Sequence, residues 1–196
     1  MNGEIKMKFI LASASPRRKE LMEMLGVDEL TVLPAKGEEK ADKELAPEEL
    51  VKALARAKAE EIAPCAGLDD VVIAADTVVW VDGRLFGKPH TKKEAYEMLR
   101  TLSGRAHEVF TGLTVIRNGI ELTESERSLV YFRDLSDEEI NAYIETGEPM
   151  DKAGAYGAQG KAALFVKKID GDFFNVMGLP LCRLGEMLKK QGVVIL

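Results

Sequence analysis

Apolar residues run almost without interruption from Val71 to Val81, and only Asp76 and Thr77 break the run. A continuous β-branched run of this length is typical of a strand that is covered on both faces of a sheet. An ionised carboxylate inside such a strand costs free energy unless it is paired, hydrogen-bonded or bound to a metal. Asp76 therefore caps a bend, pairs with an arginine in the core or belongs to a functional site, and basic groups elsewhere in the chain favour the site.

Shorter apolar patterns predict further strands and helices, separated by turn signals such as Asp82-Gly83 and Asn118-Gly119. Strands are expected at 9–12, 30–33, 84–86, 109–116, 129–132, 163–169, 173–177 and 193–196. Helices are expected at 16–25, 47–62, 92–102, 137–146 and from 181 onward. The alternation predicts one α/β domain over residues 1–196, in which helices flank a mixed β-sheet and two lobes enclose a cleft.

The first expected helix begins with an unusual charge pattern. Ser15 is a suitable N-cap, and Pro16 suits the first helical position because its φ is preset and it has no amide hydrogen. Arg17 and Arg18 then lie in the first turn, where the helix dipole disfavours cations. Two arginines beside exposed backbone N–H groups form an anion site, for which phosphate is the natural ligand. A solvated surface pair is the alternative, and the spacing alone does not separate the two.

Other polar features become candidates for a site only if they fold close to Asp76. Lys58 lies at the edge of the apolar stripe of its helix, where it either snorkels to solvent or points to a phosphate. Lys88 follows the hairpin that starts with the Asp76 strand. A polar loop at 36–40 contains adjacent glutamates, and three glycines at 154–160 mark backbone that turns tightly or approaches a ligand.

Composition narrows the class of protein. The chain has 196 residues, of which 46% are hydrophobic and 31% charged, as expected of a globular protein with a substantial core. Its formal net charge of -6 argues against a nucleic-acid-binding surface, although a local basic pocket remains compatible with a small anion. Cys65 and Cys182 lie far apart without metal-binding spacing, and no segment is apolar enough for a signal peptide or a bilayer. We therefore expect a cytoplasmic protein without a membrane partner.

Five short motifs, in order along the chain, resemble those of the Maf proteins. They are LASASPRR at 11–18, ADT at 75–77, GKP at 87–89, LSG at 102–104 and DKAGAYG at 151–157. The resemblance covers nearly the whole chain and implies a fold similar to that of inosine triphosphate pyrophosphatase. It also implies an activity, the house-cleaning hydrolysis of a nucleoside triphosphate to the monophosphate and pyrophosphate, with Mg²⁺ or Mn²⁺ as the cofactor.

Motif by motif, the resemblance assigns roles to individual residues. It implies that Asp76 is the catalytic carboxylate and that Asp76 and Glu39 are the metal ligands. The positions that match substrate-binding residues of the family are Ser13, Arg17, Arg18, Glu39, Lys58, Thr77, Lys88 and Gln159. Glu39 is preferred to Glu38 because the acidic run of the family motif ends in glutamate.

Three of these positions indicate the substrate. Arg17, Thr77 and Gln159 resemble the branch of the family that acts on dTTP and UTP, whereas the branch that acts on 7-methyl-GTP has an acidic residue in place of Gln159. An amide donates and accepts hydrogen bonds at once, which matches the imide edge of uracil or thymine. Gly87, where relatives often carry a larger or acidic residue, departs from the pattern at the pocket wall.

Two other functions compete with the pyrophosphatase. One is a nucleotide-binding regulator of septum formation, which would act on cell division through contacts and without turnover. The other is a phosphatase of monophosphates or sugar phosphates, which would release orthophosphate. The sequence leaves open the oligomeric state, a homodimer included, the metal used, and whether modified pyrimidine triphosphates are the natural substrates.

Overall fold

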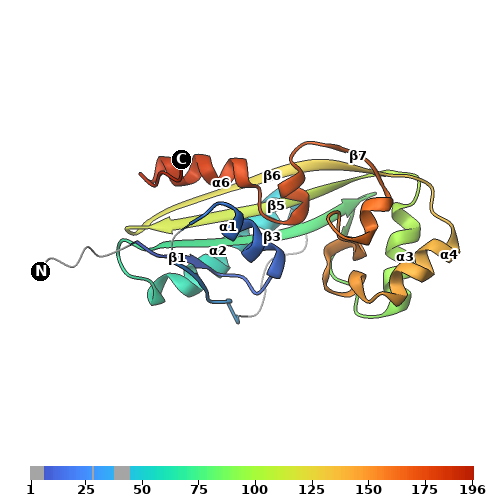
Figure 1. The fold of residues 1–196 in the computed structure, drawn as a ribbon, viewed down its shortest axis with the longest axis horizontal. Helices are drawn as coiled ribbons and strands as arrows, with labels where there is room; N and C mark the ends of the chain where they lie inside the picture. The colour runs from blue at the N-terminus through green and yellow to red at the C-terminus, as the bar shows by residue number, and fades with distance from the viewer. Residues whose placement is uncertain (1–6, 28, 38–44) are drawn as a thin grey trace, which may run out of the picture.

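The computed structural model describes residues 7–27, 29–37 and 45–196. Seven strands of this part of the chain form one sheet in the order β2-β1-β3-β5-β6-β7, with β4 paired to β3 (Figure 1). The strands are β1 Phe9–Leu11, β2 Leu30–Val32, β3 Val71–Val81, β4 Arg84–Phe86, β5 Ala106–Arg117, β6 Ile120–Phe132 and β7 Val166–Asp170. Strand β1 is parallel to β2 and β3, and the remaining pairs are antiparallel, so the expected mixed sheet is confirmed.

Helices pack on the sheet and at one end of it. The α-helices are α1 Pro16–Met24, α2 Pro47–Ile62, α3 Lys92–Leu102, α4 Asp137–Glu145, α5 Phe173–Met177 and α6 Leu181–Lys190. Short 3₁₀ helices are η1 Ala63–Cys65, η2 Glu148–Asp151, η3 Ala153–Ala155 and η4 Lys161–Leu164. In the described part of the chain, no helix combines the length and the apolar character that crossing a bilayer requires.

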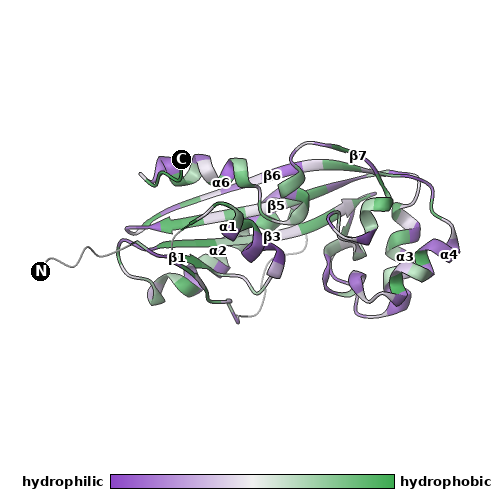
Figure 2. Ribbon diagram, in the orientation of Figure 1, coloured by the Kyte–Doolittle hydropathy of each residue, from purple (hydrophilic) through white to green (hydrophobic). Residues whose placement is uncertain are grey.

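Successive side chains of β3 point to opposite faces of the sheet, so this strand contributes to the core on both faces. Val72 packs with Ile62 of α2 on one face. Ile73 points to the other face, where it packs with Leu21 of α1 and Leu184 of α6. The hydrophobic colouring of β3 in Figure 2 is the expected result for a strand covered on both sides.

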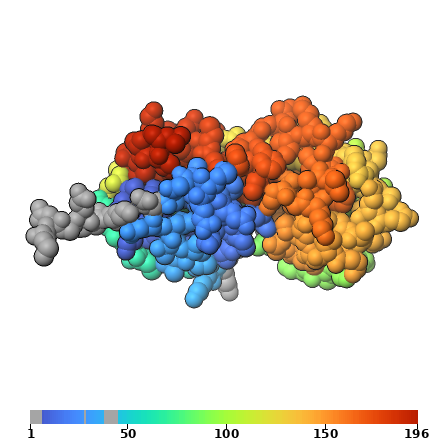
Figure 3. All heavy atoms as spheres, in the orientation of Figure 1, coloured from blue at the N-terminus to red at the C-terminus, as the bar shows by residue number. Residues whose placement is uncertain are grey.

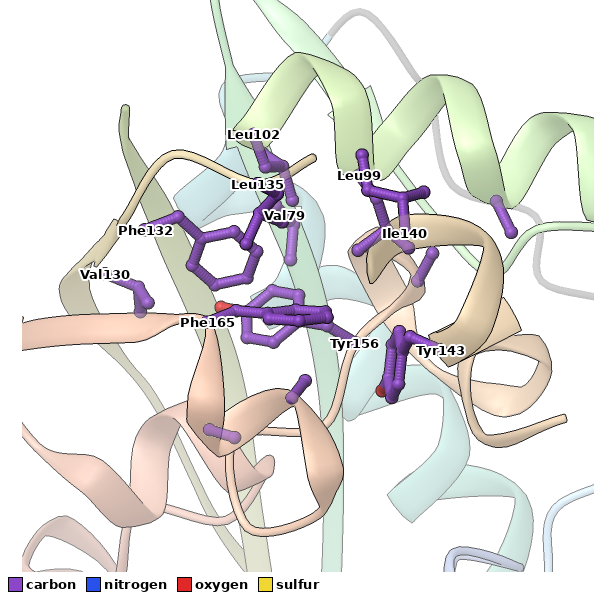
Figure 4. Packing of buried hydrophobic residues seen from close by; sticks show 14 of the residues in the cluster. Val79, Leu99, Leu102, Val130, Phe132, Leu135, Ile140, Tyr143, Tyr156 and Phe165 are labelled. Atoms are coloured by element: carbon purple, nitrogen blue, oxygen red, sulfur yellow. The ribbon is translucent and has the colours of Figure 1, made fainter. Parts of the chain in front are cut away.

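The long strands continue past α2 into a second lobe, which contains α3, α4 and the 3₁₀ helices η2 to η4 (Figure 1). Its core includes Phe132, Tyr156 and Phe165, and the ring centroids of Phe132 and Tyr156 lie 4.8 Å apart in an edge-to-face arrangement (Figure 4). Figure 3 shows the blue N-terminal segment of the first lobe lying beside the orange part of the second. The two expected lobes are therefore present on one sheet.

Two of the expected strands are wrong. Residues 173–177 form helix α5, because Asp172 caps its start by accepting a hydrogen bond from Phe174 N (2.7 Å). Residues 193–196 do not join the sheet, since Val193 N donates to Leu188 O (2.9 Å) and closes the end of α6 instead. Similarly, the strand expected from residue 163 begins at Val166, because η4 occupies the preceding residues.

Strands β5 and β6 are longer than their apolar patterns predict. Asn118 and Gly119 both have positive φ, 52° and 72°, as a two-residue hairpin turn requires. Residues 121–126 of β6 are mostly polar and half-buried, so they carry no continuous apolar signal. The register set by the turn, rather than hydrophobicity, extends this hairpin.

Candidate active site

The carboxylate of Asp76 lies on the α2 face of β3, at the junction of the two lobes. Its side chain is 13% exposed, and it forms an ion pair and hydrogen bond with the ammonium group of Lys58, which is 21% exposed. The buried carboxylate of Asp76 is therefore paired with a lysine of α2, and not with an arginine of the core. Lys58 is directed to the site and does not merely snorkel to solvent.

Gly112 allows α2 to approach the sheet at this level. It is the residue of β5 that pairs with Asp76, and a Cβ atom built on it would lie 2.1 Å from the carbonyl oxygen of Val51 in α2. Only a glycine leaves room for backbone at that distance. Because Lys58 lies two helical turns after Val51, the same close approach carries its side chain to Asp76.

Thr77, the next residue, faces the opposite side of the sheet, where it meets Arg18 of α1. Arg18 donates three hydrogen bonds to oxygen atoms of the protein: Nε to Gly178 O (2.7 Å), Nη1 to Ser13 Oγ (3.1 Å) and Nη2 to Thr77 Oγ1 (3.1 Å). The guanidinium therefore joins the end of β1, the end of α5 and the centre of β3. These contacts hold Arg18 in a fixed position beside the start of α1.

The start of α1 keeps the expected shape, but its cap differs in detail. Ser15 occupies the N-cap position with an extended backbone, and its side chain makes no capping hydrogen bond. Instead, Ser13 Oγ accepts a hydrogen bond from Ser15 N (3.2 Å). The first-turn amides are therefore not satisfied by a Ser15 cap, which agrees with an anion site at this helix start.

An ion pair connects the two lobes across the site. Arg17 Nη1 lies 3.1 Å from Asp151 Oδ2, and Asp151 Oδ1 accepts a hydrogen bond from Lys152 Nζ (2.6 Å). Partial burial raises the pKa of the Asp151 carboxyl, but the hydrogen bonds and charges of Lys152 and Arg17 lower it further, so the net pKa lies below its usual range. Asp151 is therefore a stable counter-charge for Arg17.

Glu148 anchors the glycine-rich loop at residues 154–160, which carries Gln159. Glu148 Oε1 accepts a hydrogen bond from Tyr143 (2.9 Å), and Oε2 accepts one from Lys161 N (3.1 Å). A Cβ atom at Gly160 would lie 2.1 Å from Glu148 Oε1, so a larger residue here would displace the Glu148 carboxylate from its hydrogen bonds to the loop. The exposed side chain of Gln159 is thus presented to the cleft by a firmly anchored loop.

A cavity of about 750 Å³ brings these groups together, and both lobes line it. The predicted site residues along it are Ser13, Arg17, Arg18, Lys58, Asp76, Thr77, Lys88 and Gln159. Lys88 is exposed and makes no hydrogen bond or ion pair with a described residue, so it is available to a ligand. Glu39, like Glu38, lies outside the described residues, and its predicted role stays a prediction.

The donor set of the cavity is compatible with a magnesium-type cation. Among the described residues, no group of three or more His, Cys, Asp or Glu side chains is placed to hold a metal, and the carboxylates lining the cavity are Asp76 and Asp151. Mg²⁺ is commonly bound by one or two carboxylates together with substrate phosphates, and it retains water ligands. Asp76 in this largely basic cavity fits that mode of binding, and the described residues alone do not form an all-protein cage.

The sequence reasoning did not single out three residues of this site. Asp151 and Lys152 lie in a recognised motif, but the ion pairs of Asp151 with Arg17 and with Lys152 were not expected. Thr111 is fully buried and hydrogen-bonds to Thr77 Oγ1 (2.9 Å). The signal for Thr111 exists only in the strand register, in which it pairs with Thr77.

Comparisons with known proteins identify the family to which the chain is similar. The family described as "Maf-like protein" matches residues 8–191. A dTTP/UTP pyrophosphatase of Alkaliphilus oremlandii is 53% identical over 94% of this chain and 96% of its own length. Proteins with the same name from Methanosarcina mazei and Bacillus velezensis are 47% and 49% identical, over 96% and 95% of this chain and 96% and 97% of their own lengths.

Solved structures show the same fold at lower identity. A HAM1 protein from Coxiella burnetii aligns with a TM-score of 0.54 at 18% identity, over 94% of this chain and 100% of its own. The Ham1 protein of Staphylococcus aureus aligns with a TM-score of 0.55 at 14% identity, over 94% and 99%. At such identities the likeness concerns the fold alone, and it confirms the expected architecture of a mixed sheet with two lobes.

Proposed function

Because the chain belongs to the Maf-like family, we propose that it is a nucleoside triphosphate pyrophosphatase that hydrolyses dTTP and UTP to the monophosphate and pyrophosphate. Near-full-length relatives named dTTP/UTP pyrophosphatase, at 47–53% identity, support the reaction and the substrates. The observation that carries the proposal in this chain is the carboxylate of Asp76 inside a cavity whose other charged lining is mostly cationic. Such a cavity suits a triphosphate and offers one group to act on water.

The basic residues bind the phosphate tail. Arg17 and the start of α1 face the cavity from the first lobe, and Lys88 faces it from the loop after β4. Charge-assisted hydrogen bonds from these groups stabilise the negative charge that grows on the departing pyrophosphate. The Arg17–Asp151 pair is exchanged for an Arg17–phosphate contact when the substrate enters.

Asp76 acts as the general base. It orients a water molecule toward the α-phosphorus, accepts its proton as the bond to the β-phosphate breaks, and is itself held in place by Lys58. Asp76 and the phosphate oxygens would hold Mg²⁺ or Mn²⁺, with Glu39 as the further ligand that the family resemblance implies. When bound, the cation supplies charge neutralisation on the triphosphate.

Gln159 and Thr77 read the nucleoside. Both line the cavity, Gln159 from the anchored loop of the second lobe and Thr77 from β3. The amide of Gln159 pairs with the imide edge of uracil or thymine, since it can donate and accept at the same time. A purine ring with a donor-rich edge offers a poorer match to this amide.

The cellular part of the proposal is the removal of unwanted pyrimidine triphosphates from the cytoplasmic nucleotide pool. Cys65 and Cys182 are both free and exposed, which supports a reducing compartment. The name of the relatives, dTTP/UTP pyrophosphatase, favours turnover over the alternative of a septum-formation regulator that binds a nucleotide without hydrolysing it.

One assay tests the proposal. The purified chain is incubated with dTTP, UTP, GTP and 7-methyl-GTP in the presence of Mg²⁺ or Mn²⁺, and pyrophosphate, orthophosphate and monophosphate are measured. We expect equal amounts of pyrophosphate and monophosphate from dTTP and UTP, and loss of turnover when a chelator is added. Release of orthophosphate would indicate a phosphatase, and binding without products would indicate the regulator.

A further inference from the structure

Four groups form a continuous hydrogen-bonded series from the cavity into the core. Arg18 Nη2 lies 3.1 Å from Thr77 Oγ1, Thr77 Oγ1 lies 2.9 Å from Thr111 Oγ1, and Thr111 Oγ1 lies 3.0 Å from the backbone oxygen of Asn175. Thr77 lines the cavity, whereas Thr111 is fully buried behind it and does not. Thr111 can therefore influence a ligand only indirectly, and Thr77 is the cavity-lining side chain to which it hydrogen-bonds.

The chemistry of the two ends sets the direction of every hydrogen bond between them. A carbonyl oxygen only accepts, so the single hydroxyl hydrogen of Thr111 is donated to Asn175 O. Thr111 must then accept from Thr77, which uses the single hydroxyl hydrogen of Thr77. A guanidinium only donates, so Thr77 accepts from Arg18, which agrees with this assignment. Thr77 has no hydrogen left to offer a ligand.

The inner end of the series is rigid. The side chain of Asn175 is fully buried and donates to Val109 O (3.1 Å) and Ser128 Oγ (2.9 Å), which fixes α5 on the sheet. At the outer end, Gly178 leaves space open beside Thr77, because a Cβ atom there would lie 3.2 Å from Thr77 Oγ1. The threonine oxygen is thus held by the core and remains accessible from the cavity.

We propose that Thr111 is a positioning residue that makes Thr77 a fixed hydrogen-bond acceptor for a donor group of the bound nucleoside. The proposal rests on the proposed function, since it assumes that the cavity binds a nucleoside triphosphate. A hydroxyl free to rotate would serve donors and acceptors alike, whereas the hydroxyl held by Thr111 selects donors. Thr111 then contributes to specificity without touching the substrate.

Two donors of the nucleoside have the required chemistry. One is the N3–H of the uracil or thymine imide, which Thr77 would share with the amide oxygen of Gln159 and which cytosine lacks because its N3 is an acceptor. The other is the 3′-hydroxyl of the sugar, since a 2′-hydroxyl is absent from dTTP. CTP removes the first donor and 3′-deoxy-UTP removes the second, so these two analogues distinguish the sources.

The test compares kcat/KM for UTP, CTP and 3′-deoxy-UTP, measured by pyrophosphate release, in the wild type and in Thr111→Val. Valine keeps the shape of threonine but frees the Thr77 hydroxyl to donate. We expect the preference for UTP over one of the two analogues to fall by about tenfold, the effect of one hydrogen bond. Thr111→Ser, which restores the hydroxyl, should restore the preference.

Thr114→Val is the matched control. Thr114 is also fully buried on β5 and hydrogen-bonds to a threonine, Thr123 (2.9 Å), but it does not line the cavity and lies outside the series. A purely structural effect would lower kcat/KM for all three nucleotides equally, and equal losses in Thr111→Val would overturn the proposal.

A second variant keeps the proposal testable if Thr111→Val does not fold. Thr77→Val removes the acceptor itself, and it should lower the same UTP preference. Retention of the preference in Thr77→Val would overturn the proposal whatever happens to Thr111→Val. Absence of pyrophosphate from the wild type would instead refute the proposed function, so the two failures are distinguishable.

Discussion

Lys58 of α2 places its ammonium group against the carboxylate of Asp76 in β3, and both side chains are mostly buried beside the cavity. Desolvating two opposite charges costs free energy that their attraction only partly offsets. Two apolar residues would pack here at lower cost, so we attribute this pair to function. The pair holds the carboxylate in one orientation, as a general base requires.

Asp76→Asn should lower kcat by a factor on the order of 10²–10⁴ while the protein stays folded. The amide keeps the shape of the side chain but cannot accept the proton of the attacking water. Turnover of UTP by pyrophosphate release is the measurement, and thermal unfolding checks the fold. Asp82→Asn is the control, because Asp82 is exposed at the end of the same strand, pairs with Arg105 and lies away from the cavity. A variant at Asp76 with nearly full activity would remove it from the role of base.

Lys58→Met should lower kcat/KM for UTP by roughly 10- to 100-fold, the effect of losing one charge-assisted hydrogen bond. Methionine retains the apolar stem but leaves Asp76 without its partner and the substrate without one cation. Lys52→Met, on the same helix, removes a lysine that pairs with Glu48 and Glu49 and does not line the cavity. Equal kinetic effects of the two variants would contradict a specific role for Lys58.

Gly112→Ala should destabilise the protein by about 1–3 kcal/mol and reduce activity, because overpacking forces backbone to move. The added methyl would meet the carbonyl of Val51 at 2.1 Å, so α2 has to shift and carry Lys58 away from Asp76. Denaturant unfolding and UTP turnover are measured on the same preparation. Gly185→Ala, in an open position of α6, should have the opposite sign and stabilise by about 0.5–1 kcal/mol.

The sequence could specify β3 and much of the site for simple physical reasons. An eleven-residue run of mostly apolar, β-branched residues is most stable as a strand that is covered on both faces. The boundaries Val71–Val81 were therefore predicted correctly. The helix around Lys58 follows from its own apolar period, which also placed that lysine near the buried face. These features depend on local pattern alone.

Other features depend on contacts that local pattern does not contain. Residues 173–177 are mostly apolar and begin with two aromatic residues, as a short strand can, but the Asp172 cap and the buried Asn175 make them a helix. Arg17 and Asp151 are 134 residues apart and meet only because the sheet carries both lobes. The role of Thr111 needs the strand register and the position of α5 together.

His107 should make the protein less stable in acid. Burial lowers the pKa of His107 from 6.5 to about 3. Between these two values the unfolded chain binds a proton that the folded chain does not, so the free energy of unfolding falls as pH falls from about 6.5 toward 3. At pH 4.5, two pH units below the unfolded value, this group contributes roughly 2–3 kcal/mol of destabilisation.

His107→Gln should therefore flatten the acid limb of the stability profile measured by denaturant unfolding at pH 7, 5.5 and 4.5. The amide can retain the hydrogen bond that His107 Nε2 makes with Tyr156 (2.7 Å), but it does not titrate. His90→Gln, which changes the other histidine of the chain at an exposed position, should leave the profile unchanged. Parallel profiles for His107→Gln and the wild type would show that His107 binds a proton as readily in the folded protein as in the unfolded chain.

Gln159→Glu should weaken the use of dTTP and UTP by at least about tenfold in kcat/KM, because a carboxylate cannot donate to a carbonyl oxygen of the imide. The side chain is exposed, so the free energy of unfolding should not change. Asn141→Asp is the control, since it makes the same amide-to-carboxylate change on the exposed face of α4, away from the cavity. If Gln159→Glu keeps the pyrimidine preference of the wild type, the base is read by another residue, and the anchored loop over Glu148 serves only to close the cavity.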